Sequence, residues 1–384
     1  MKILHLADLH LGKLVNGLSM IENQEYVLNE CIELCEKEHI KHIIIAGDVY
    51  DRAIPPESAV KLLNDFLSVA IIEKKWKVYI ISGNHDSQER LGCFNEILER
   101  QGIYIDNRIN EDLKLTKHVL EEDGVKVNLY ALPYFHQTRI RTLTGDESIT
   151  DLETATKRVI EANEINKNEI NFLSTHLFVS GIEELVRSGS ESRLSVGTIE
   201  QVSYRVFDDF DYVALGHLHA PQKVGRETVR YAGSPLRYDV SEIEQHKAFT
   251  IIDVKSKDDI QIEKVEIKPL YNFVYKEGTV DELTQNSEIK DFDLIYFKLT
   301  DKKVVLNASS RLKIKYPHFI GLEYTQLEGE ENTPTSLTKG SDFESLTPSE
   351  QFDKFFTYML GKEMDEIQKE TVESICEEIF KEDK

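Results

Sequence analysis

Residues of the kinds that bind divalent metals recur along the chain in five short motifs. The motifs are Asp8-Leu9-His10, Gly47-Asp48, Gly83-Asn84-His85-Asp86, the segment that ends at His176, and Gly216-His217-Leu218-His219. Asp8 and His10 are two residues apart, as are His217 and His219. In an extended chain, residues i and i+2 face the same side, so each of these pairs can converge on one point.

Seven of these residues offer imidazole nitrogen, carboxylate oxygen or amide oxygen, and none offers a thiolate. They are Asp8, His10, Asp48, Asn84, His176, His217 and His219. Such a donor set suits Mn, Fe, Zn or a similar divalent ion, and seven ligands are too many for one ion. The pattern therefore predicts two metals that share one carboxylate. Such a pair can clamp a phosphoryl group and generate hydroxide near neutral pH for the hydrolysis of phosphate esters.

Every motif ends an apolar run that is typical of a β-strand. The runs span residues 2–8, 41–48, 76–86, 169–176 and 211–219, and helices are expected at 19–38 and 56–72. This alternation predicts a mostly parallel sheet covered by helices, with ligands beyond the carboxyl ends of its strands. A single Asp or His at the end of a strand usually caps a helix or forms a turn. That explanation is poor for five successive apolar runs that all end in such residues.

The composition is that of a globular protein with an excess of acidic charge. Of the 384 residues, 40% are hydrophobic and 30% are charged, which is enough for one large domain with appendages or for two domains. The 69 acidic and 46 basic residues give a formal net charge of −23, which by itself argues against a nucleic acid substrate. Two bound divalent metals would weaken that argument, because they bring positive charge to the site.

The sequence gives no sign of a membrane or of an oxidising compartment. No run approaches the roughly 18 apolar residues of a membrane span, and Asp8 and His10 interrupt the apolar start too early for a signal peptide. The four cysteines lack the spacing of a zinc knuckle or a redox motif, so we interpret them as reduced structural thiols. We therefore expect a cytoplasmic protein.

The same motifs carry a resemblance to a known family. "DLH" at Asp8, "GDVYDR" at Gly47, "GNHD" at Gly83, "STH" ending at His176 and "GHLH" at Gly216 together resemble the calcineurin-like metallophosphoesterases. The resemblance implies an α/β fold in which two sheets form an αββα sandwich.

A narrower resemblance covers nearly the whole chain. "ADLHLGK", "GDVYDRAIPP", "SGNHDS", "DYVALGHLHAPQ", "YAGSPLRY" and "LNASSRL" resemble the nuclease subunits of bacterial DNA repair complexes within that family. The resemblance implies a double-strand 3′–5′ exonuclease and single-strand or hairpin endonuclease that acts on DNA in repair, recombination and replication. It implies two divalent metal ions, Mn²⁺ foremost, with Mg²⁺, Fe²⁺ or Zn²⁺ as alternatives. It further implies an SMC-like ATPase partner, which binds through the base of its coiled coil, and a homodimer within a heterotetramer.

Carried over residue by residue, the family pattern assigns a role to each ligand. Asp8, His10 and His219 bind one metal, Asn84, His176 and His217 bind the other, and Asp48 bridges the two. The resemblance implies that His85 stands beside the metals and protonates the leaving oxygen or stabilises the transition state. Asp86 is expected to hold the loop in shape and to take no direct part in the reaction.

Asp51 follows the bridging Asp48 by three residues. Related phosphatases have an aspartate at this step of the motif, where it orients the motif histidine, so we expect a catalytic dyad of Asp51 and His85. Archaeal and eukaryotic relatives of the nuclease commonly carry a histidine at this position. The alternative that Asp51 only caps the turn before Pro55 therefore stays open.

Basic residues near the motifs could bind DNA phosphates. The candidates are Lys13, Arg52, Arg187, Arg193 and Arg237. Solvated surface charges that balance the excess of acid explain these residues equally well.

The character of the chain changes after residue 270. Residues 1–270 are expected to form the nuclease domain. Residues 271–326 show strand and helix patterns in the order β-α-β-α-β, which the resemblance implies is a capping domain that helps to select the DNA. Residues 327–343 are polar and rich in helix and strand breakers, which indicates a linker.

Residues 344–384 are predicted to form a helical segment that binds a partner. Thr347, Pro348 and Glu350 make a capping box, and Gly361 ends the first helix. The apolar residues of the two amphipathic stretches include Phe352, Phe355, Phe356, Met359, Leu360, Ile367, Ile375 and Ile379. A hairpin beyond a linker cannot easily reach the main core, so we expect it to dock on the ATPase partner rather than to fold back on its own chain.

Three functions are compatible with these motifs. A DNA nuclease that works with an ATPase accounts for the ligands, the capping unit and the helical tail. A small-molecule phosphodiesterase or phosphatase would use the same catalytic core and would need neither appendage. A non-enzymatic scaffold would have lost ligands, whereas all seven ligand positions and His85 are filled.

Overall fold

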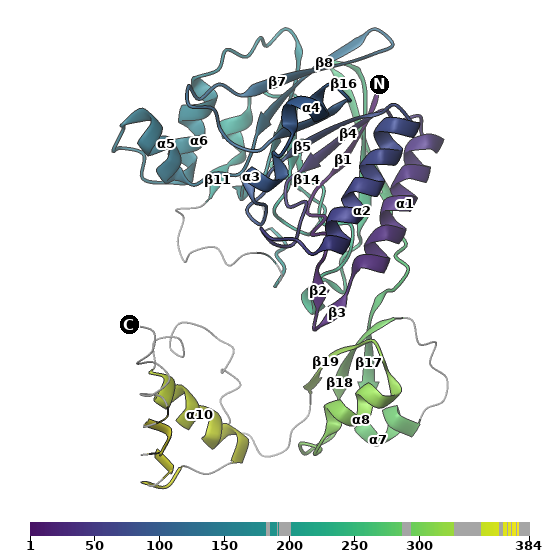
Figure 1. Ribbon diagram of the computed structural model, residues 1–384, viewed down its shortest axis with the longest axis vertical. Helices are drawn as coiled ribbons and strands as arrows, with labels where there is room; N and C mark the ends of the chain where they lie inside the picture. Colours follow the sequence, from purple (N-terminus) through teal and green to yellow (C-terminus); the bar gives the residue numbers. More distant parts are fainter. Residues whose placement is uncertain are drawn as a thin grey trace. The chain divides into compact units, whose positions relative to one another are not determined.

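The chain divides into two compact units. One comprises Met1–Lys298 with Asn307–Glu323, and the other comprises Leu299–Leu306 with Tyr324–Lys384. The computed structural model describes residues 1–181, 185–189, 191, 201–285, 293–325, 347–360, 364–366, 368–369, 371–373 and 375 (Figure 1). The expected linker at 327–343 lies outside these residues. Across the described parts of the chain, no helix combines the length and the apolar character needed to cross a membrane.

The first six-stranded sheet has the order β16-β15-β1-β4-β5-β6. Its strands are β1 (Lys2–Leu6), β4 (His42–Ala46), β5 (Lys77–Ile81), β6 (Ile103–Asp106), β15 (Ala248–Ser256) and β16 (Asp259–Glu266). The first four of these strands are parallel, and β15 and β16 are antiparallel. Helices α1 (Ile21–Lys37) and α2 (Glu57–Ser68), the latter followed by a π-helical turn at Val69–Glu73, connect β1, β4 and β5 as the periodicity predicts.

The second six-stranded sheet has the order β13-β14-β12-β9-β8-β7. Its strands are β7 (Thr116–Glu122), β8 (Val125–Leu132), β9 (Ile170–Thr175), β12 (Tyr212–Leu215), β13 (Gln222–Val224) and β14 (Arg226–Tyr231). The four central strands are parallel, and the two edge strands are antiparallel to their neighbours. Helices α5 (Gln137–Thr144) and α6 (Leu152–Glu161) lie between β8 and β9 in the chain.

Three buried clusters define the layers of the fold. Apolar residues of both sheets, including Ile44 and Tyr212, pack together in one cluster. A second cluster joins the first sheet to α1 and α2 through residues such as Val27 and Leu63, and a third joins the second sheet to α6 through Val159. The predicted α/β class is confirmed, and the layers follow the order helix, sheet, sheet, helix.

Short elements lie between these strands and helices in the chain. They are β2 (Leu14–Val15), β3 (Leu18–Ser19), α3 (Gln88–Leu91), α4 (Asn95–Glu99), β10 (Val179–Ser180), β11 (Val202–Ser203) and 3₁₀ turns at Tyr204–Phe207 and Val240–Glu242.

A third sheet follows β16 and has the order β17-β18-β19. It contains β17 (Phe273–Gly278), β18 (Leu294–Leu299) and β19 (Phe319–Tyr324), with α7 (Val280–Gln285) and α8 (Ala308–Lys315) between them. This is the β-α-β-α-β order that the sequence predicts for 271–326. The boundary at residue 270 and a separate capping domain stay predictions.

Helix α10 (Pro348–Leu360) begins with the predicted capping box. Thr347 N donates to Glu350 Oε2 over 2.7 Å, and Glu350 N donates to Thr347 Oγ1 over 3.4 Å. Phe352 and Phe355 are 44% and 49% exposed. Residues Ile367 and Ile379 and the side chains of Met359 and Leu360 lie outside the described part of this segment.

Candidate metal centre

Main-chain hydrogen bonds hold the loops after β1 and β4 side by side. Asp8 N donates to Gly47 O over 3.1 Å, and His10 N donates to Asp48 O over 3.0 Å. Asp8, His10 and Asp48 have positive φ angles of 53°, 43° and 48°. Such angles cost non-glycine residues roughly 1–3 kcal/mol each and are retained chiefly at functional sites. The backbone itself therefore marks this rim as a candidate site.

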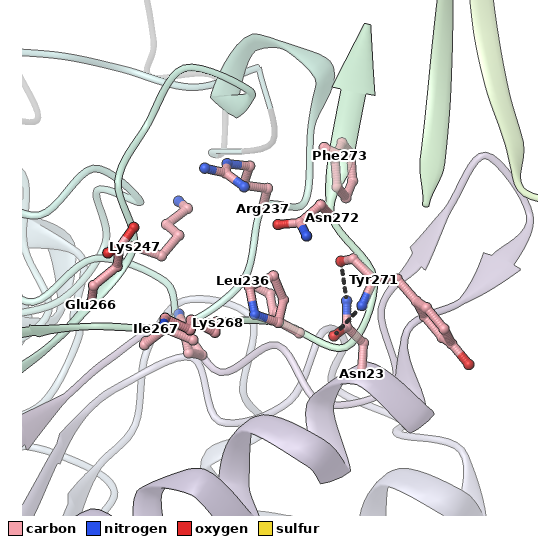
Figure 2. A pocket seen from close by; sticks show the side chains of 12 residues that line it. Asn23, Leu236, Arg237, Lys247, Glu266, Ile267, Lys268, Tyr271, Asn272 and Phe273 are labelled. Carbon is pink, nitrogen blue, oxygen red and sulfur yellow. Dashed lines mark hydrogen bonds between the residues drawn. The ribbon is translucent and has the colours of Figure 1, made fainter. Parts of the chain in front are cut away.

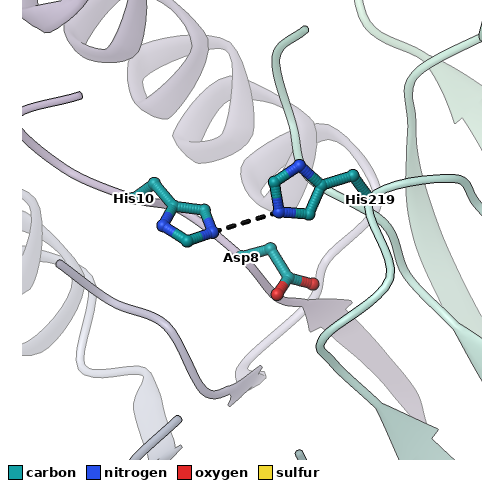
Figure 3. Close-up of side chains that lie close together, drawn as sticks. All are labelled: Asp8, His10 and His219. Carbon is teal, nitrogen blue, oxygen red and sulfur yellow. Dashed lines mark hydrogen bonds between the residues drawn. The ribbon is translucent and has the colours of Figure 1, made fainter. Parts of the chain in front are cut away.

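Asp8, His10 and His219 form the first group of ligand atoms (Figure 3). His10 Nε2 and His219 Nε2 are 3.1 Å apart, and all three residues are at most 1% exposed. The Asp8 carboxylate accepts hydrogen bonds from His217 N over 2.9 and 3.1 Å. The loops after β1 and β12 thus deliver three buried donor groups to one point.

Asn84, His176 and His217 form the second group. The amide oxygen of Asn84 lies 3.1 Å from both His176 Nε2 and His217 Nδ1. His176 Nδ1 lies 2.7 Å from the main-chain oxygen of Ala46, to which it donates. In the neutral form of the ring, this hydrogen bond leaves the lone pair on Nε2 and turns it toward Asn84.

The Asp48 carboxylate lies between the two groups. Its Oδ2 atom is 3.5 Å from His10 Nε2 and 3.4 Å from His176 Nε2. Its Oδ1 atom accepts a hydrogen bond from His85 N over 2.9 Å. One carboxylate oxygen can therefore contact both groups.

Several ligand atoms of the centre are hydrogen-bond acceptors that face one another. Asn84 Oδ1 is an acceptor, and Nε2 of the fully buried His176, 3.1 Å away, is a second acceptor whenever the ring is neutral. Two facing acceptors repel unless a proton or a cation lies between them. Imidazole, carboxylate and amide groups are ligands of divalent metals, so the seven residues fit two such ions.

Two glycines allow the ligand loops to approach each other closely. Gly47 has a φ angle of +86°, and a Cβ atom there would lie 2.3 Å from His176 Nδ1. A Cβ atom at Gly83 would lie 2.1 Å from Asp48 Oδ1. Any other residue at these positions would displace a candidate ligand.

The ionisable groups of the centre act strongly on one another. Burial raises the pKa of Asp8 to about 7, although His176 and His219 oppose the shift. Burial also disfavours the charged form of Asp48, but His176 and His10 outweigh it and hold the pKa of Asp48 well below its usual range. Burial lowers the pKa of His176, and Asp48 and Asp8 more than reverse this and raise it to about 9. Electrostatic surroundings that retain a proton on a buried imidazole also favour a bound cation.

Asp51 contacts His85 through its main chain. His85 Nδ1 lies 2.8 Å from the main-chain oxygen of Asp51. The Asp51 carboxylate lies 2.8 Å from Lys13 Nζ and 3.8 Å from His10 Nδ1. The carboxylate is thus paired with the ammonium of Lys13, and the catalytic role of Asp51 stays a prediction.

Asp86 braces the loop, as the sequence predicts. Its Oδ1 atom accepts a hydrogen bond from Tyr50 N over 3.0 Å, and its Oδ2 atom accepts from Val49 N and Gly83 N over 3.1 and 2.9 Å. Burial, with a contribution from Asp48, raises the pKa of Asp86 to about 6. The residue thereby ties the loop after β4 to the loop after β5.

Two of the candidate DNA-binding residues flank the centre. Lys13 contacts the Asp51 carboxylate, and Arg52 Nη2 lies 3.9 Å from the same carboxylate with 54% of its side chain exposed. Both cations therefore stand beside the ligand groups.

The other candidates have different surroundings. Arg187 Cζ lies 4.4 Å from the centre of the Phe178 ring. Arg237 donates from Nε and Nη2 to the main-chain oxygen of Gln245 over 3.1 and 2.6 Å. Arg193 lies outside the described residues.

Sequence reasoning missed a buried polar layer behind the ligands. Gln24 Nε2 donates to His10 O over 2.8 Å, and Tyr238 OH donates to Leu9 O. Glu242 Oε1 lies 3.0 Å from His219 Nδ1. None of the supporting side chains belongs to a metal-binding motif, so only their burial beside a ligand identifies them.

A pocket of about 250 Å³ adjoins this layer (Figure 2). Figure 2 shows Lys247 and Arg237 toward one end and Asn23 with Tyr271 toward the other. Asn23 Nδ2 donates to Tyr271 O over 3.0 Å, and Asn23 Oδ1 accepts from Leu270 N over 2.9 Å. Helix α1 is thereby tied to the segment that leads into the third sheet.

The strand ends of the two sheets bring nitrogen and oxygen ligands together around a shared carboxylate. This arrangement defines a class of enzyme. This class is the metal-dependent phosphodiester hydrolases. Residues 1–221 match the family described as calcineurin-like phosphoesterase, and the chain belongs to that family. It is 30% identical over 379 residues to SbcD, the D component of the nuclease SbcCD of Staphylococcus epidermidis, a match that covers 98% of each chain.

Two solved structures are among those that the chain matches. A dimetal phosphatase from Danio rerio matches 70% of this chain and 98% of its own length, with a TM-score of 0.41 and 11% identity. The phosphoesterase YfcE from E. coli matches 70% of this chain and 100% of its own length, with a TM-score of 0.28 and 14% identity.

Proposed function

We propose that the protein is a two-metal DNA nuclease that acts with an SMC-like ATPase, SbcC. The observation that carries the proposal is the position of Asp48 Oδ2, which is 3.5 Å from His10 Nε2 and 3.4 Å from His176 Nε2. The identity of 30% with an SbcD nuclease over nearly the whole chain supports DNA as the substrate and SbcC as the partner.

Each group of ligand atoms would hold one divalent cation. Asp8, His10 and His219 would hold the first, Asn84, His176 and His217 would hold the second, and Asp48 lies beside both groups of ligand atoms. When bound, the two cations supply positive charge for the phosphate oxygens and make water a strong nucleophile near neutral pH. Mn²⁺ is the first candidate, and Mg²⁺, Fe²⁺ and Zn²⁺ are alternatives with suitable ligand preferences.

His85 is the proposed general acid. Its side chain is 24% exposed beside the buried ligands, so a substrate can reach it. Because Nδ1 lies against the main-chain oxygen of Asp51, Nε2 faces the centre at 4.0 Å from Asp48 Oδ2. A protonated Nε2 can donate its proton to the sugar oxygen as that oxygen leaves the phosphorus.

The remaining parts of the chain serve the substrate and the partner. Lys13 and Arg52 are suited to contact DNA phosphates beside the centre, and the third sheet is proposed to cap the DNA. The exposed rings of Phe352 and Phe355 on α10 support docking of this helix on the coiled-coil base of SbcC. By resemblance, the working complex is a heterotetramer with two copies of each protein.

The test is a nuclease assay on blunt-ended and hairpin DNA with Mn²⁺ or Mg²⁺, with and without ATP and SbcC. His85→Ala is expected to lower kcat by roughly 10²–10⁴-fold, because the proton donor is lost, and to retain two metals per chain. His246→Ala, a change at an exposed histidine, is the matched control. Hydrolysis of cyclic nucleotides or phosphopeptides without hydrolysis of DNA would replace this function by that of a small-molecule phosphodiesterase or phosphatase.

A further inference from the structure

Glu242 is a fully buried carboxylate that contacts a candidate metal ligand. Its Oε1 atom lies 3.0 Å from His219 Nδ1, and the residue is 0% exposed. The other ring nitrogen of His219, Nε2, faces His10 (Figure 3). The His219 ring is therefore held between a carboxylate on one side and the first ligand group on the other.

A buried lysine compensates the charge of this carboxylate. Lys247 Nζ lies 2.7 Å from Glu242 Oε2, 2.9 Å from Ser234 Oγ and 2.8 Å from His219 O. Glu242 Oε1 also accepts a hydrogen bond from Ser188 Oγ over 2.6 Å, and Oε2 accepts from Tyr238 N over 3.2 Å, so both carboxylate oxygens face donors. A carboxylate paired with an ammonium and surrounded by donors acts as the acceptor, so His219 Nδ1 is the donor in their hydrogen bond.

We propose that Glu242, with Lys247 as its counter-ion, is the positioning residue of His219. The hydrogen bond from Nδ1 fixes the tautomer, leaves the lone pair on Nε2 and aims that lone pair at the first ligand group. A carboxylate behind a ligating imidazole also makes the imidazole a stronger base, and loss of such a partner typically weakens metal binding. This inference rests on the metal centre of the proposed function.

The two ligand groups depend on different kinds of support. His176, in the second group, donates from Nδ1 to the main-chain oxygen of Ala46 over 2.7 Å, which no side-chain substitution removes. His219, in the first group, depends on the side chain of Glu242. Removal of the charges of Glu242 and Lys247 should therefore weaken cation binding in the first group alone. An ion pair that only stabilised the fold would produce no such difference between the groups.

The test compares the wild-type chain with the double variant Glu242→Gln/Lys247→Met. This variant removes both buried charges together, so that neither is left unpaired in the interior. Glu266→Gln/Lys268→Met makes the same chemical changes at exposed residues of the adjoining pocket and is the matched control (Figure 2). Calorimetric titration of the metal-free proteins with Mn²⁺ gives the Kd of each site, and electron paramagnetic resonance distinguishes a coupled Mn²⁺ pair from a single ion.

Wild type and control are expected to bind two Mn²⁺ ions per chain and to show the spectrum of a coupled pair. In the Glu242→Gln/Lys247→Met variant, one Kd should rise about 10- to 100-fold while the other is unchanged, with a single-ion spectrum at limiting Mn²⁺. Unchanged Kd values, or equal weakening of both sites, would overturn the inference and leave the metal centre standing. Fewer than two ions bound by wild type would overturn the proposed function, and the inference with it.

A third variant keeps the inference testable if the double variant does not fold. Glu242→Asp retains the negative charge beside Lys247 but withdraws the carboxylate from His219 Nδ1 by one methylene group. It is expected to show the same one-sided loss of Mn²⁺ affinity. Two unchanged sites in a folded Glu242→Asp protein would contradict a positioning role.

Discussion

At the scale of single residues, Asp51 presents two different groups to the centre. Its main-chain oxygen lies 2.8 Å from His85 Nδ1, whereas its carboxylate lies 3.8 Å from His10 Nδ1 and next to Lys13. His10 Nδ1 is buried and has no hydrogen-bond partner among the described residues. A substitution of the side chain therefore probes the carboxylate and leaves the support of His85 in place.

Asp51→Asn is expected to lower kcat on DNA about 10-fold and to leave two metals bound, because the seven ligands and the contact to His85 are all retained. Steady-state kinetics and elemental analysis of the purified protein measure the two quantities. Asp65→Asn, on the exposed face of α2, is the control. Loss of metal from Asp51→Asn would show instead that the carboxylate supports His10 as a ligand.

His5 provides a residue-scale prediction for the dependence of stability on pH. Its Nδ1 atom lies 2.9 Å from Tyr212 OH, and burial, assisted by Arg230, lowers its pKa to about 3. The unfolded chain takes up this proton near pH 6.5, so the stabilising contribution is complete above that pH and is lost as the pH falls toward 3. The loss is at most about 1.4 kcal/mol per pH unit.

His5→Gln should therefore show a shallower fall in the free energy of unfolding between pH 6.5 and pH 4.5 than wild type does. Urea titrations at several pH values measure this difference, and His246→Gln at an exposed position is expected to follow wild type. Equal slopes for wild type and His5→Gln would show that His5 does not account for this sensitivity to acid.

At the scale of elements, the centre depends on how closely the loops after β4 and β5 approach each other. A Cβ atom at Gly83 would lie 2.1 Å from Asp48 Oδ1 and 2.3 Å from Asp48 N. The Asp48 carboxylate therefore lies directly against the loop that carries Asn84, and there is no room for a side chain at Gly83. The spacing of the two loops therefore controls both groups of ligand atoms.

Gly83→Ala is expected to destabilise the fold by roughly 1–3 kcal/mol and to lower the metal content of both sites, because the loops must separate to admit the methyl group. Thermal unfolding and elemental analysis measure these changes. Gly124→Ala, in open space between β7 and β8, should lose stability through its φ of +78° but keep its metal. Full metal content in Gly83→Ala would contradict this role of the loop spacing.

At the scale of the whole molecule, the proposed activities lie in different parts of the chain. All seven candidate ligands belong to the unit that contains Met1–Lys298, whereas α10 belongs to the other unit. Phe352 and Phe355 keep 44% and 49% of their surface exposed. Catalysis and partner binding should therefore be separable by deletion.

Deletion of residues 344–384 is expected to abolish binding of SbcC and to leave hydrolysis of a small phosphodiester within about twofold of wild type, because no candidate ligand is removed. Size-exclusion chromatography with SbcC and a chromogenic phosphodiester assay provide the two measurements. Phe352→Ser/Phe355→Ser tests the same surface without shortening the chain. SbcC binding by the deletion variant would move the docking surface elsewhere.

The sequence by itself determined the donor groups, the strands that carry them and the class of fold. This was possible because strand and helix periods are local, and because a polar residue after an apolar run already indicates which end of a strand it occupies. The capping box of α10 and the bracing role of Asp86 were predictable for the same reason, since both depend on short-range chemistry.

Only the tertiary structure decided which groups meet. His10 and His219 approach within 3.1 Å although they are 209 residues apart, and Asp51 contacts His85 through its main chain. Glu242 and Lys247 belong to no motif and acquire a role only because they are buried behind His219. Such contacts depend on how two sheets pack and on which cation competes for a carboxylate, and neither is encoded in local periodicity.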